Sequence, residues 1–408
     1  MDLSTNKKIK GTNWFQVYLL IGAGVVCAFQ IGKVPPALPV IRNDLGLDLI
    51  FTGWLIGVYA LFAAVFGIFG GAFSDAAGYR RSLLFGLSCI TIGSFSGAIA
   101  PDGLSLLIAR FIEAVGYLPI VVSVPALLGQ VTVSEGDRRV AAGIWGAYMP
   151  AGTAIMMLLA PIFLSSDGIG WRGLWLLNAL IAGLYILIII RATPLIDGRK
   201  PQWTRFRYTR REVGRLLKSP ASVLLGIFFG TYAGNYLTVF GFLPTMLVED
   251  LGLNLSEAAL LAALAVGVNI GGNIFGGWLR KINIRFSTIL VFGSFFTALS
   301  AIGIFSNFFT PEIRYAMAIL YSSVCGIIPG ATWSAAVSLA PSKDLAGTAI
   351  GCVVQGGNLG TLVLPPLTAG LVAIFAGWHA AIIAVSGASI LGVALALAIA
   401  RVAKEPSN

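Results

Sequence analysis

Apolar residues fill almost the whole chain in blocks of about twenty, and short polar segments separate the blocks. A helix of about twenty residues crosses the hydrocarbon core of a bilayer, because it rises about 1.5 Å per residue and the core is about 30 Å thick. The blocks predict spans near residues 14–35, 50–72, 82–100, 104–130, 140–164, 173–191, 220–247, 257–279, 286–306, 313–339, 346–375 and 378–401. We therefore predict an all-α integral membrane protein with 12 transmembrane helices.

The composition supports this interpretation. Hydrophobic residues make up 57% of the 408 residues and charged residues only 11%, whereas ordinary soluble domains carry about 25% charge. The mean hydropathy is +0.88. The chain has too few polar residues to cover the surface of a soluble fold of this size, so we expect the apolar residues to form membrane spans and face lipid.

The positions of the basic residues explain the net charge of +10. Of the 27 lysines and arginines, Arg42, Arg172 and Arg314 fall on one side of the predicted membrane, and Lys33 and Arg110 fall within spans. The other 22 lie on the side of the two termini. Because cytoplasmic loops carry the excess of basic residues, we predict cytoplasmic termini and contacts with membrane lipids, and we expect no nucleic-acid partner.

The two halves of the chain share a spaced pattern. Leu38-Pro39 and the segment Asp44-Leu45-Gly46-Leu47 recur as Leu243-Pro244 and Asp250-Leu251-Gly252-Leu253, at offsets of 205 and 206. Six spans return a chain to its starting side, so such repeats share one orientation. We predict two six-helix pseudo-repeats, at 1–191 and 219–408, joined by a basic cytoplasmic linker at 192–218.

A loop between the second and third spans carries a recognisable spacing. The run from Gly71 to Arg81 reads G-x-x-x-D-x-x-G-x-R-R, and it resembles the loop signature of the major facilitator superfamily, with Ala76 where that family usually has a basic residue. The resemblance implies the major facilitator fold and alternating access between two halves. It also implies a conformational role for the motif residues Gly71, Asp75, Gly78, Arg80 and Arg81.

Burying a charged side chain in the membrane is costly, so ionisable residues within the predicted spans are candidates for a functional role. Lys33 follows Gln30 near the outer end of the first span, and Arg110 and Glu113 lie on one face of the fourth. We expect the three charges to share the outer half of one pocket, where a net charge of +1 would attract a small anion. Glu113 is the only carboxylate in the interior of a predicted span, since Glu257 stands at the first position of another, so Glu113 is the candidate for proton coupling. The alternative is a structural pair of Arg110 with Glu113, with Lys33 reaching the outer surface.

Neutral polar and aromatic residues complete the candidate site. Tyr232, Asn235 and Tyr236 lie on one face of the seventh span, and Trp333 lies in the tenth. In the resembled fold, spans 1, 4, 7 and 10 line the central cavity, which would place these side chains opposite Lys33 and Glu113. Ordinary packing is the alternative for the aromatic residues.

The runs Gly32-Lys33-Val34-Pro35-Pro36-Ala37-Leu38-Pro39 and Gly170-Trp171-Arg172-Gly173-Leu174-Trp175 resemble the bacterial cyanate permease branch. The resemblance implies a secondary transporter of a small anion in the inner membrane of a bacterium, and with Glu113 as the coupling candidate we expect symport with protons. Proton-driven efflux of drugs or metabolites is the alternative.

We expect no enzyme activity, cofactor or metal. The single histidine, His379, has no partner cluster in the sequence. The cysteines all fall within spans without a C-x-x-C pair, which is typical of small buried residues; they are Cys27, Cys89, Cys325 and Cys352.

Overall fold

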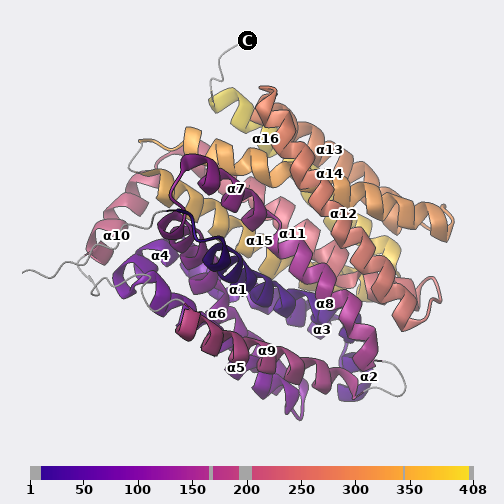
Figure 1. The fold of residues 1–408 in the computed structure, drawn as a ribbon. Helices are drawn as coiled ribbons and strands as arrows, with labels where there is room; N and C mark the ends of the chain where they lie inside the picture. Colours follow the sequence, from indigo (N-terminus) through magenta and orange to yellow (C-terminus); the bar gives the residue numbers. More distant parts are fainter. Residues whose placement is uncertain (1–10, 165–168, 193–204, 343–344, 404–408) are drawn as a thin grey trace, which may run out of the picture.

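The computed structural model describes residues 11–164, 169–192, 205–342 and 345–403, with only the backbone at 71, 75 and 205–210. In this part of the chain the regular structure is helical throughout, without a strand (Figure 1). Residues 193–204 of the predicted linker lie outside the described residues. The predicted all-α membrane fold is confirmed.

We call the helices α1 to α9 the first half and the helices α11 to α16 the second half. The first half contains α1 (Trp14–Gly32), α2 (Val34–Leu45), α3 (Leu49–Gly57), the short turn η1 (Val58–Ala60), α4 (Leu61–Ala77), α5 (Tyr79–Ala98), α6 (Gly103–Val131), α7 (Glu135–Gly146), α8 (Tyr148–Leu164) and α9 (Gly170–Ala192). The second half contains α11 (Pro220–Glu249), α12 (Leu255–Lys281), α13 (Phe286–Phe305), α14 (Pro311–Ser338), α15 (Ala346–Ile374), the turn η3 (Trp378–Ala380) and α16 (Ala381–Val402). Between them lies α10 (Arg205–Leu216), which packs against α4 and α15.

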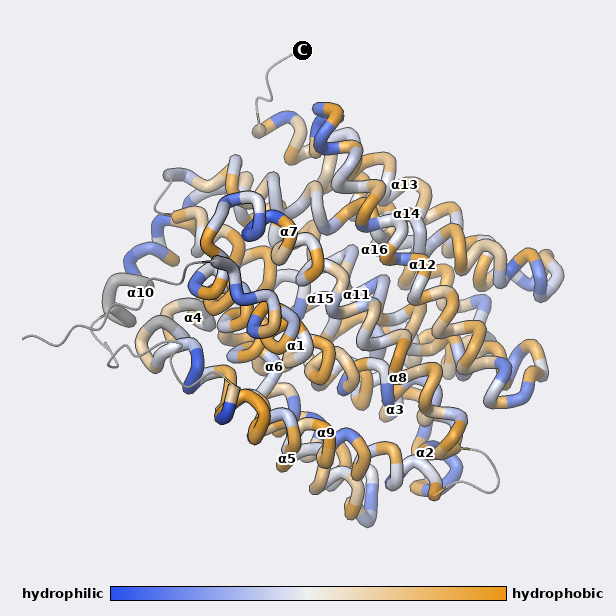
Figure 2. The backbone as a smooth tube through the Cα atoms, in the orientation of Figure 1, coloured by the Kyte–Doolittle hydropathy of each residue, from blue (hydrophilic) through white to orange (hydrophobic). Residues whose placement is uncertain are grey.

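Eleven stretches of the described chain are long and apolar enough to cross a membrane. They correspond to all the predicted spans except the third, which is α5. This helix has 20 residues, but it begins next to Arg80 and Arg81 and contains four serines, which reduces its hydropathy. It packs between α6 and α9, and Figure 2 shows its mixture of apolar and polar positions.

The first span differs from its predicted end at residue 35, because the helical path continues to Leu45 after a break at Lys33. Pro35 and Pro36 lie in the first turn of α2. Backbone N–H groups in the first turn of a helix make no hydrogen bond within it, so proline, which lacks this group, is tolerated there. The prolines therefore start a second helix instead of ending the span.

The internal repeat has a structural basis at the ends of α2 and α11. Gly46 and Gly252 occupy equivalent places in the repeated segments and have φ angles of 63° and 69°. A residue with a side chain adopts this left-handed conformation at a cost, whereas glycine does not. Gly46 is the C-terminal cap of α2, and Gly252 lies two residues beyond Asp250, the C-terminal cap of α11, so glycine permits the left-handed backbone just after both helices.

Three large apolar cores organise the helices, and a small fourth one joins α10 to α15. One core contains residues of both halves, among them Leu38, Ile56, Leu243 and Met246. A second lies within the first half and includes Leu87 and Ile120, and a third lies within the second half. The halves are thus joined by apolar packing at the α2 side, the end of the molecule where α2 lies, and each also has a core of its own.

The closest helix contact within the second half joins α11 and α15. A Cβ atom added at Gly360 would lie 1.9 Å from the backbone oxygen of Gly230, so the two backbones approach too closely for any side chain. Small residues permit this approach between membrane helices.

We predict that Gly360→Ala lowers the thermal unfolding midpoint of the purified protein, because the added methyl group must push α11 and α15 apart. Overpacking of this kind typically costs about 1–3 kcal/mol. Gly370→Ala is the matched control on the same helix, since a Cβ there meets nothing within 4 Å. Equal midpoints for the two variants would contradict the tight contact.

Candidate functional site

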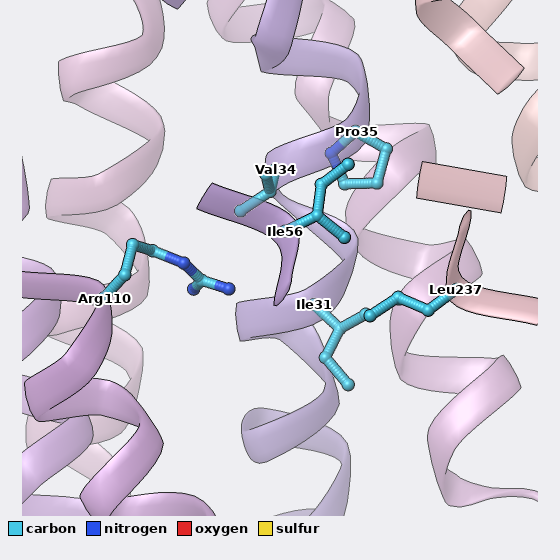
Figure 3. A pocket seen from close by; sticks show the side chains of 6 residues that line it. All are labelled: Ile31, Val34, Pro35, Ile56, Arg110 and Leu237. Atoms are coloured by element: carbon cyan, nitrogen blue, oxygen red, sulfur yellow. The ribbon is translucent and has the colours of Figure 1, made fainter. Parts of the chain in front are cut away.

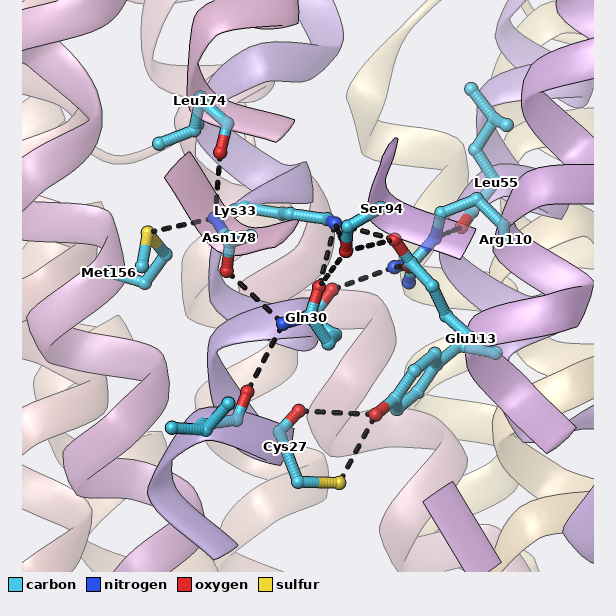
Figure 4. Close-up of polar contacts among 12 residues, drawn as sticks. Cys27, Gln30, Lys33, Leu55, Ser94, Arg110, Glu113, Met156, Leu174 and Asn178 are labelled. Carbon is cyan, nitrogen blue, oxygen red and sulfur yellow. Dashed lines mark hydrogen bonds and ion pairs between the residues drawn. The ribbon is translucent and has the colours of Figure 1, made fainter. Parts of the chain in front are cut away.

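The two cations and the carboxylate predicted within the spans form one buried cluster (Figure 4). Lys33 Nζ lies 2.6 Å from Glu113 Oε1, and an Arg110 nitrogen, Nη1, contacts the other carboxylate oxygen, Oε2. Lys33 and Glu113 have no exposed surface, and Arg110 is 1% exposed. The carboxylate therefore bridges an ammonium and a guanidinium group in the interior of the first half.

Neutral polar side chains complete the hydrogen bonding of this cluster. Gln30 Oε1 accepts hydrogen bonds from Lys33 Nζ at 2.7 Å and from Ser94 Oγ at 2.9 Å. The amide nitrogen of Gln30 donates to Asn178 Oδ1 at 3.2 Å. Lys33 thus has three oxygen partners, from Gln30, Ser94 and Glu113, which match the three donors of an ammonium group.

Aromatic faces cover both cations. Lys33 Nζ lies 4.5 Å from the ring centroid of Trp175, and Arg110 Cζ lies 4.8 Å from that of Tyr59. Such contacts stabilise a cation that has left water. They explain in part why charged groups are tolerated at this depth.

Local backbone features position the cluster. Lys33 stands at the break between α1 and α2, and Arg110 Nη1 donates to the backbone oxygen of Gln30 at 2.9 Å. On α5, a Cβ at Gly93 would lie 2.6 Å from Glu113 Cγ, so glycine there makes room for the carboxylate side chain. The cluster is therefore assembled from α1, α5, α6 and α9.

A small cavity separates the two halves beside Arg110 (Figure 3). It has a volume of about 10 Å³, roughly the space that one water molecule needs. Arg110 lines it from the first half and Leu237 from the second. No hydrogen bond from the described residues reaches Arg110 Nη2, while Nε and Nη1 are both occupied.

We expected the three charged residues to line one pocket, and the structure differs. Only Arg110 lines the cavity between the halves, because Lys33 and Glu113 turn into the first half and bind one another. The reason is electrostatic, since ions in a low-dielectric interior gain more by pairing than by facing an apolar gap.

The predicted residues of the second half lie apart from this cluster. Asn235 donates to the Val385 backbone oxygen at 3.1 Å and to Ser389 Oγ at 2.9 Å, both on α16. Tyr232 and Tyr236 belong to a series of ring contacts along α11, and Trp333 of α14 packs on Phe229 with centroids 5.2 Å apart. The described contacts do not connect them to Lys33 or Glu113.

The predicted conformational loop connects α4 and α5. Gly78 ends α4 with a φ angle of 94°, which explains the glycine in the motif. Arg80 Nη2 donates to the backbone oxygen of Ile190 on α9 at 3.1 Å, and Arg81 is exposed. Gly71 and Asp75 lie within α4, and the Asp75 side chain is outside the described part of the chain, so the role of the aspartate stays a prediction.

Two partners of the cluster were missed from the sequence, Ser94 and Asn178. Serine is common in membrane helices and gave no distinctive signal at position 94. Asn178 did offer one, because it is the only side-chain amide in α9. Among the described residues, no group of three or more histidine, cysteine, aspartate or glutamate residues is arranged to hold a metal ion.

Residues 20–365 match the family model of the Major Facilitator Superfamily. The uncharacterized MFS-type transporter YceJ of Bacillus subtilis is 26% identical over 84% of this chain and 88% of its own length. The 3-(3-hydroxy-phenyl)propionate transporter of Escherichia coli is 26% identical over 88% of this chain and 86% of its own length. Puromycin resistance protein pur8 of Streptomyces alboniger is 28% identical over 43% of this chain. The aligned segment covers 34% of the length of that relative.

Solved structures share the fold at low sequence identity. A bacterial homolog of the human lysosomal transporter Spinster, inward-facing and unoccupied, superimposes with a TM-score of 0.74 at 16% identity and covers 96% of both chains. A D-xylose-proton symporter gives a TM-score of 0.73 at 14% identity, over 95% of this chain and 97% of that one. These matches show a common arrangement of helices.

We predict that Glu113→Gln destabilises the protein far more than Lys33→Gln. The first change leaves two buried cations without a counter-ion, whereas the second leaves Arg110 and Glu113 as a neutral pair. Breaking a buried pair on one side costs about 3–5 kcal/mol. Thermal unfolding in detergent measures both effects. The double variant should be more stable than Glu113→Gln alone, because it leaves one unpaired cation in the interior instead of two.

The exposed pair of Arg139 and Glu135 is the control for this cycle. Its side chains are 77% and 79% exposed, and we expect Glu135→Gln to change stability by less than about 0.5 kcal/mol. Equal destabilisation by Glu113→Gln and Lys33→Gln would show that Glu113 is not the shared partner of the two cations.

Proposed function

The chain belongs to the Major Facilitator Superfamily, and from that premise we propose that it is a secondary transporter that moves a small organic or inorganic anion by alternating access. Membership of the family establishes a multi-pass membrane transporter of the secondary kind. The anionic substrate and the coupling ion are the parts that we propose.

The observation that supports an anion is the unbalanced charge beside the cavity. With Glu113 ionised, the cluster of Lys33, Arg110 and Glu113 carries a net charge of +1 without exposed surface to solvate it. An uncompensated charge in the membrane interior is costly. An anion next to Arg110 Nη2 would balance it, and guanidinium groups bind carboxylates and similar anions through paired hydrogen bonds.

Lys33 gives the cluster a way to accept such an anion. When a substrate competes with Glu113 for the guanidinium group of Arg110, Glu113 keeps its ion pair with Lys33 at 2.6 Å. We propose that this exchange frees Glu113 Oε2 from Arg110, which lies on the same helix, and that a proton on Glu113 completes it during transport. The proton binds the carboxylate oxygen that Arg110 releases.

One relative is consistent with this proposal. The Escherichia coli relative that aligns over 88% of this chain is named for a substrate with a propionate group, which is an anion at neutral pH. The resemblance to the cyanate permease branch also indicates an anion, and that finer assignment stays a prediction.

A second candidate function is drug or metabolite efflux. Puromycin resistance protein pur8 and the cephamycin export protein of Amycolatopsis lactamdurans align with 43% and 45% of this chain. The aromatic side chains along α11 and α14 favour this alternative, because they offer apolar contact to a large substrate. Transport of an uncharged drug that is independent of Arg110 would distinguish it from anion transport.

We propose that the described state is closed at the α2 side. There the shared apolar core joins the halves, and an ion pair between Arg42 of α2 and Glu249 of α11, 2.5 Å apart, connects them directly. We further propose that residues 1–191 and 219–408 move as the two bodies of alternating access. The excess of basic residues on the opposite side supports cytoplasmic termini in a bacterial inner membrane.

We predict that potassium salts of small carboxylates, with acetate and benzoate as probes, raise the thermal midpoint of the purified protein. A ligand at 100 times its dissociation constant stabilises the folded state by about 2.7 kcal/mol. Arg110→Lys keeps the charge but loses the planar fork, so the affinity should fall at least about tenfold.

Arg314→Lys is the matched control for this experiment. Arg314 is also buried, at 4% exposure, and it pairs with Asp250 at 2.6 Å away from the cavity. We expect the carboxylate effect to survive in this variant. If the effect is equally lost in both variants, or persists in Arg110→Lys, Arg110 does not hold the anion.

A further inference from the structure

The second half encloses a buried polar cavity of its own, between α11, α13, α14 and α16. Its volume is about 10 Å³, again roughly the space for one water-sized occupant. The oxygen-bearing side chains that the argument uses are Thr231, Asn235, Ser294, Thr297, Tyr321 and Ser389. All six are at least nine-tenths buried.

Three of these side chains present acceptors to the cavity, because their donors are committed elsewhere. Thr231 Oγ1 donates to the Phe228 backbone oxygen at 2.7 Å, and Thr297 Oγ1 donates to the Ser294 backbone oxygen at 2.9 Å. Each hydroxyl has one hydrogen, so only lone pairs remain to face inward. The two amide hydrogens of Asn235 are likewise used by Val385 and Ser389.

Several oxygens of this region have no hydrogen-bond partner among the described residues. They include Asn235 Oδ1 and Tyr321 Oη, which belong to side chains that are 3% and 0% exposed and that line the cavity. An unsatisfied buried polar atom costs about 1–3 kcal/mol. Two such atoms directed at one small space indicate a missing ligand.

The internal repeat shows what kind of ligand fits. The offset of 205 that relates Leu38-Pro39 to Leu243-Pro244 also relates Gln30 to Asn235 and Lys33 to Thr238. In the first half, the amide oxygen of Gln30 accepts from the ammonium group of Lys33 at 2.7 Å. In the second half, the corresponding amide oxygen is unpartnered, and Thr238 Oγ1 is buried and unpartnered too.

We propose that this cavity binds a single dehydrated monovalent cation, namely sodium. Neutral oxygens replace the hydration shell of monovalent ions in membrane proteins. A divalent ion is disfavoured, because its oxygen ligands normally include carboxylates and the lining has none. The small volume favours sodium over potassium.

The sodium site is separate from the anion site and does not rest on the proposed function. Tyr232 is the one lining side chain that is not fully buried, so it marks the route by which the ion enters. Since the cavity joins four helices of the second half, bound sodium would bias the packing of that half and serve as a coupling ion.

The experiment measures the thermal midpoint of the purified protein in the chlorides of sodium, potassium, ammonium and choline at equal ionic strength. We expect a saturable rise of about 2–5 °C in sodium alone. Thr297→Val keeps the shape of the side chain and removes one cavity oxygen, so the apparent affinity for sodium should fall at least about tenfold.

Two further variants keep the test interpretable. Ser389→Ala removes a second cavity oxygen and should weaken sodium binding as well, in case Thr297→Val folds poorly. Thr368→Val is the matched control, because Thr368 is a buried threonine of the same half whose hydroxyl donates to the Leu364 backbone oxygen at 2.8 Å, on α15, which does not line the cavity. Its sodium response should equal that of the wild type.

Equal midpoints in all four salts would overturn the proposal and leave water as the occupant. Stabilisation by ammonium alone would also overturn it, since the ligand would then be a hydrogen-bond donor. A sodium response that survives in both Thr297→Val and Ser389→Ala would place the ion elsewhere. Failure of the sodium response leaves the carboxylate response in potassium salts unaffected, so the two proposals are tested separately.

Discussion

The first half depends on one carboxylate that two cations share in the membrane interior. Glu113 contacts Lys33 through one oxygen and Arg110 through the other, and these partners come from the α1–α2 break and from α6. Desolvation makes each of these charges costly alone, and mutual pairing offsets much of that cost. The break after α1, the glycine on α5 beside Glu113 and the aromatic faces of Tyr59 and Trp175 all accommodate this arrangement.

The two halves use the same scaffold with different chemistry. Both halves have polar side chains in the space enclosed by their first, third, fourth and sixth helical spans. In the first half this space holds covalently attached cations and a carboxylate, and the hydrogen bonds among them are satisfied. In the second half it holds hydroxyl and amide groups, with acceptor atoms left over.

The sequence by itself determined the membrane fold, most of the helix limits and the internal repeat, but not the continuation of the first span from residue 35 to Leu45. The physical reason is that a bilayer imposes a length and a hydropathy on each span, which can be counted without knowing the partners of a helix. The glycines at two places in the sequence patterns, Gly46 and Gly78, cap α2 and α4 with positive φ angles, which glycine adopts without strain. The ionisable residues Lys33, Arg110 and Glu113 stood out because charge is rare in apolar spans.

Only the tertiary structure decided which way those residues face. The sequence could place Arg110 and Glu113 on one face of a helix, but not choose between the cavity and the interior of the half. Lys33 and Ser94 are 61 positions apart, and Gln30 and Asn178 are 148 apart, so no local pattern records their contacts. The break at Lys33 and the rotation of each helix were settled by packing and by pairing of buried charges. These are properties of the assembled helices, because each requires atoms from several of them at once.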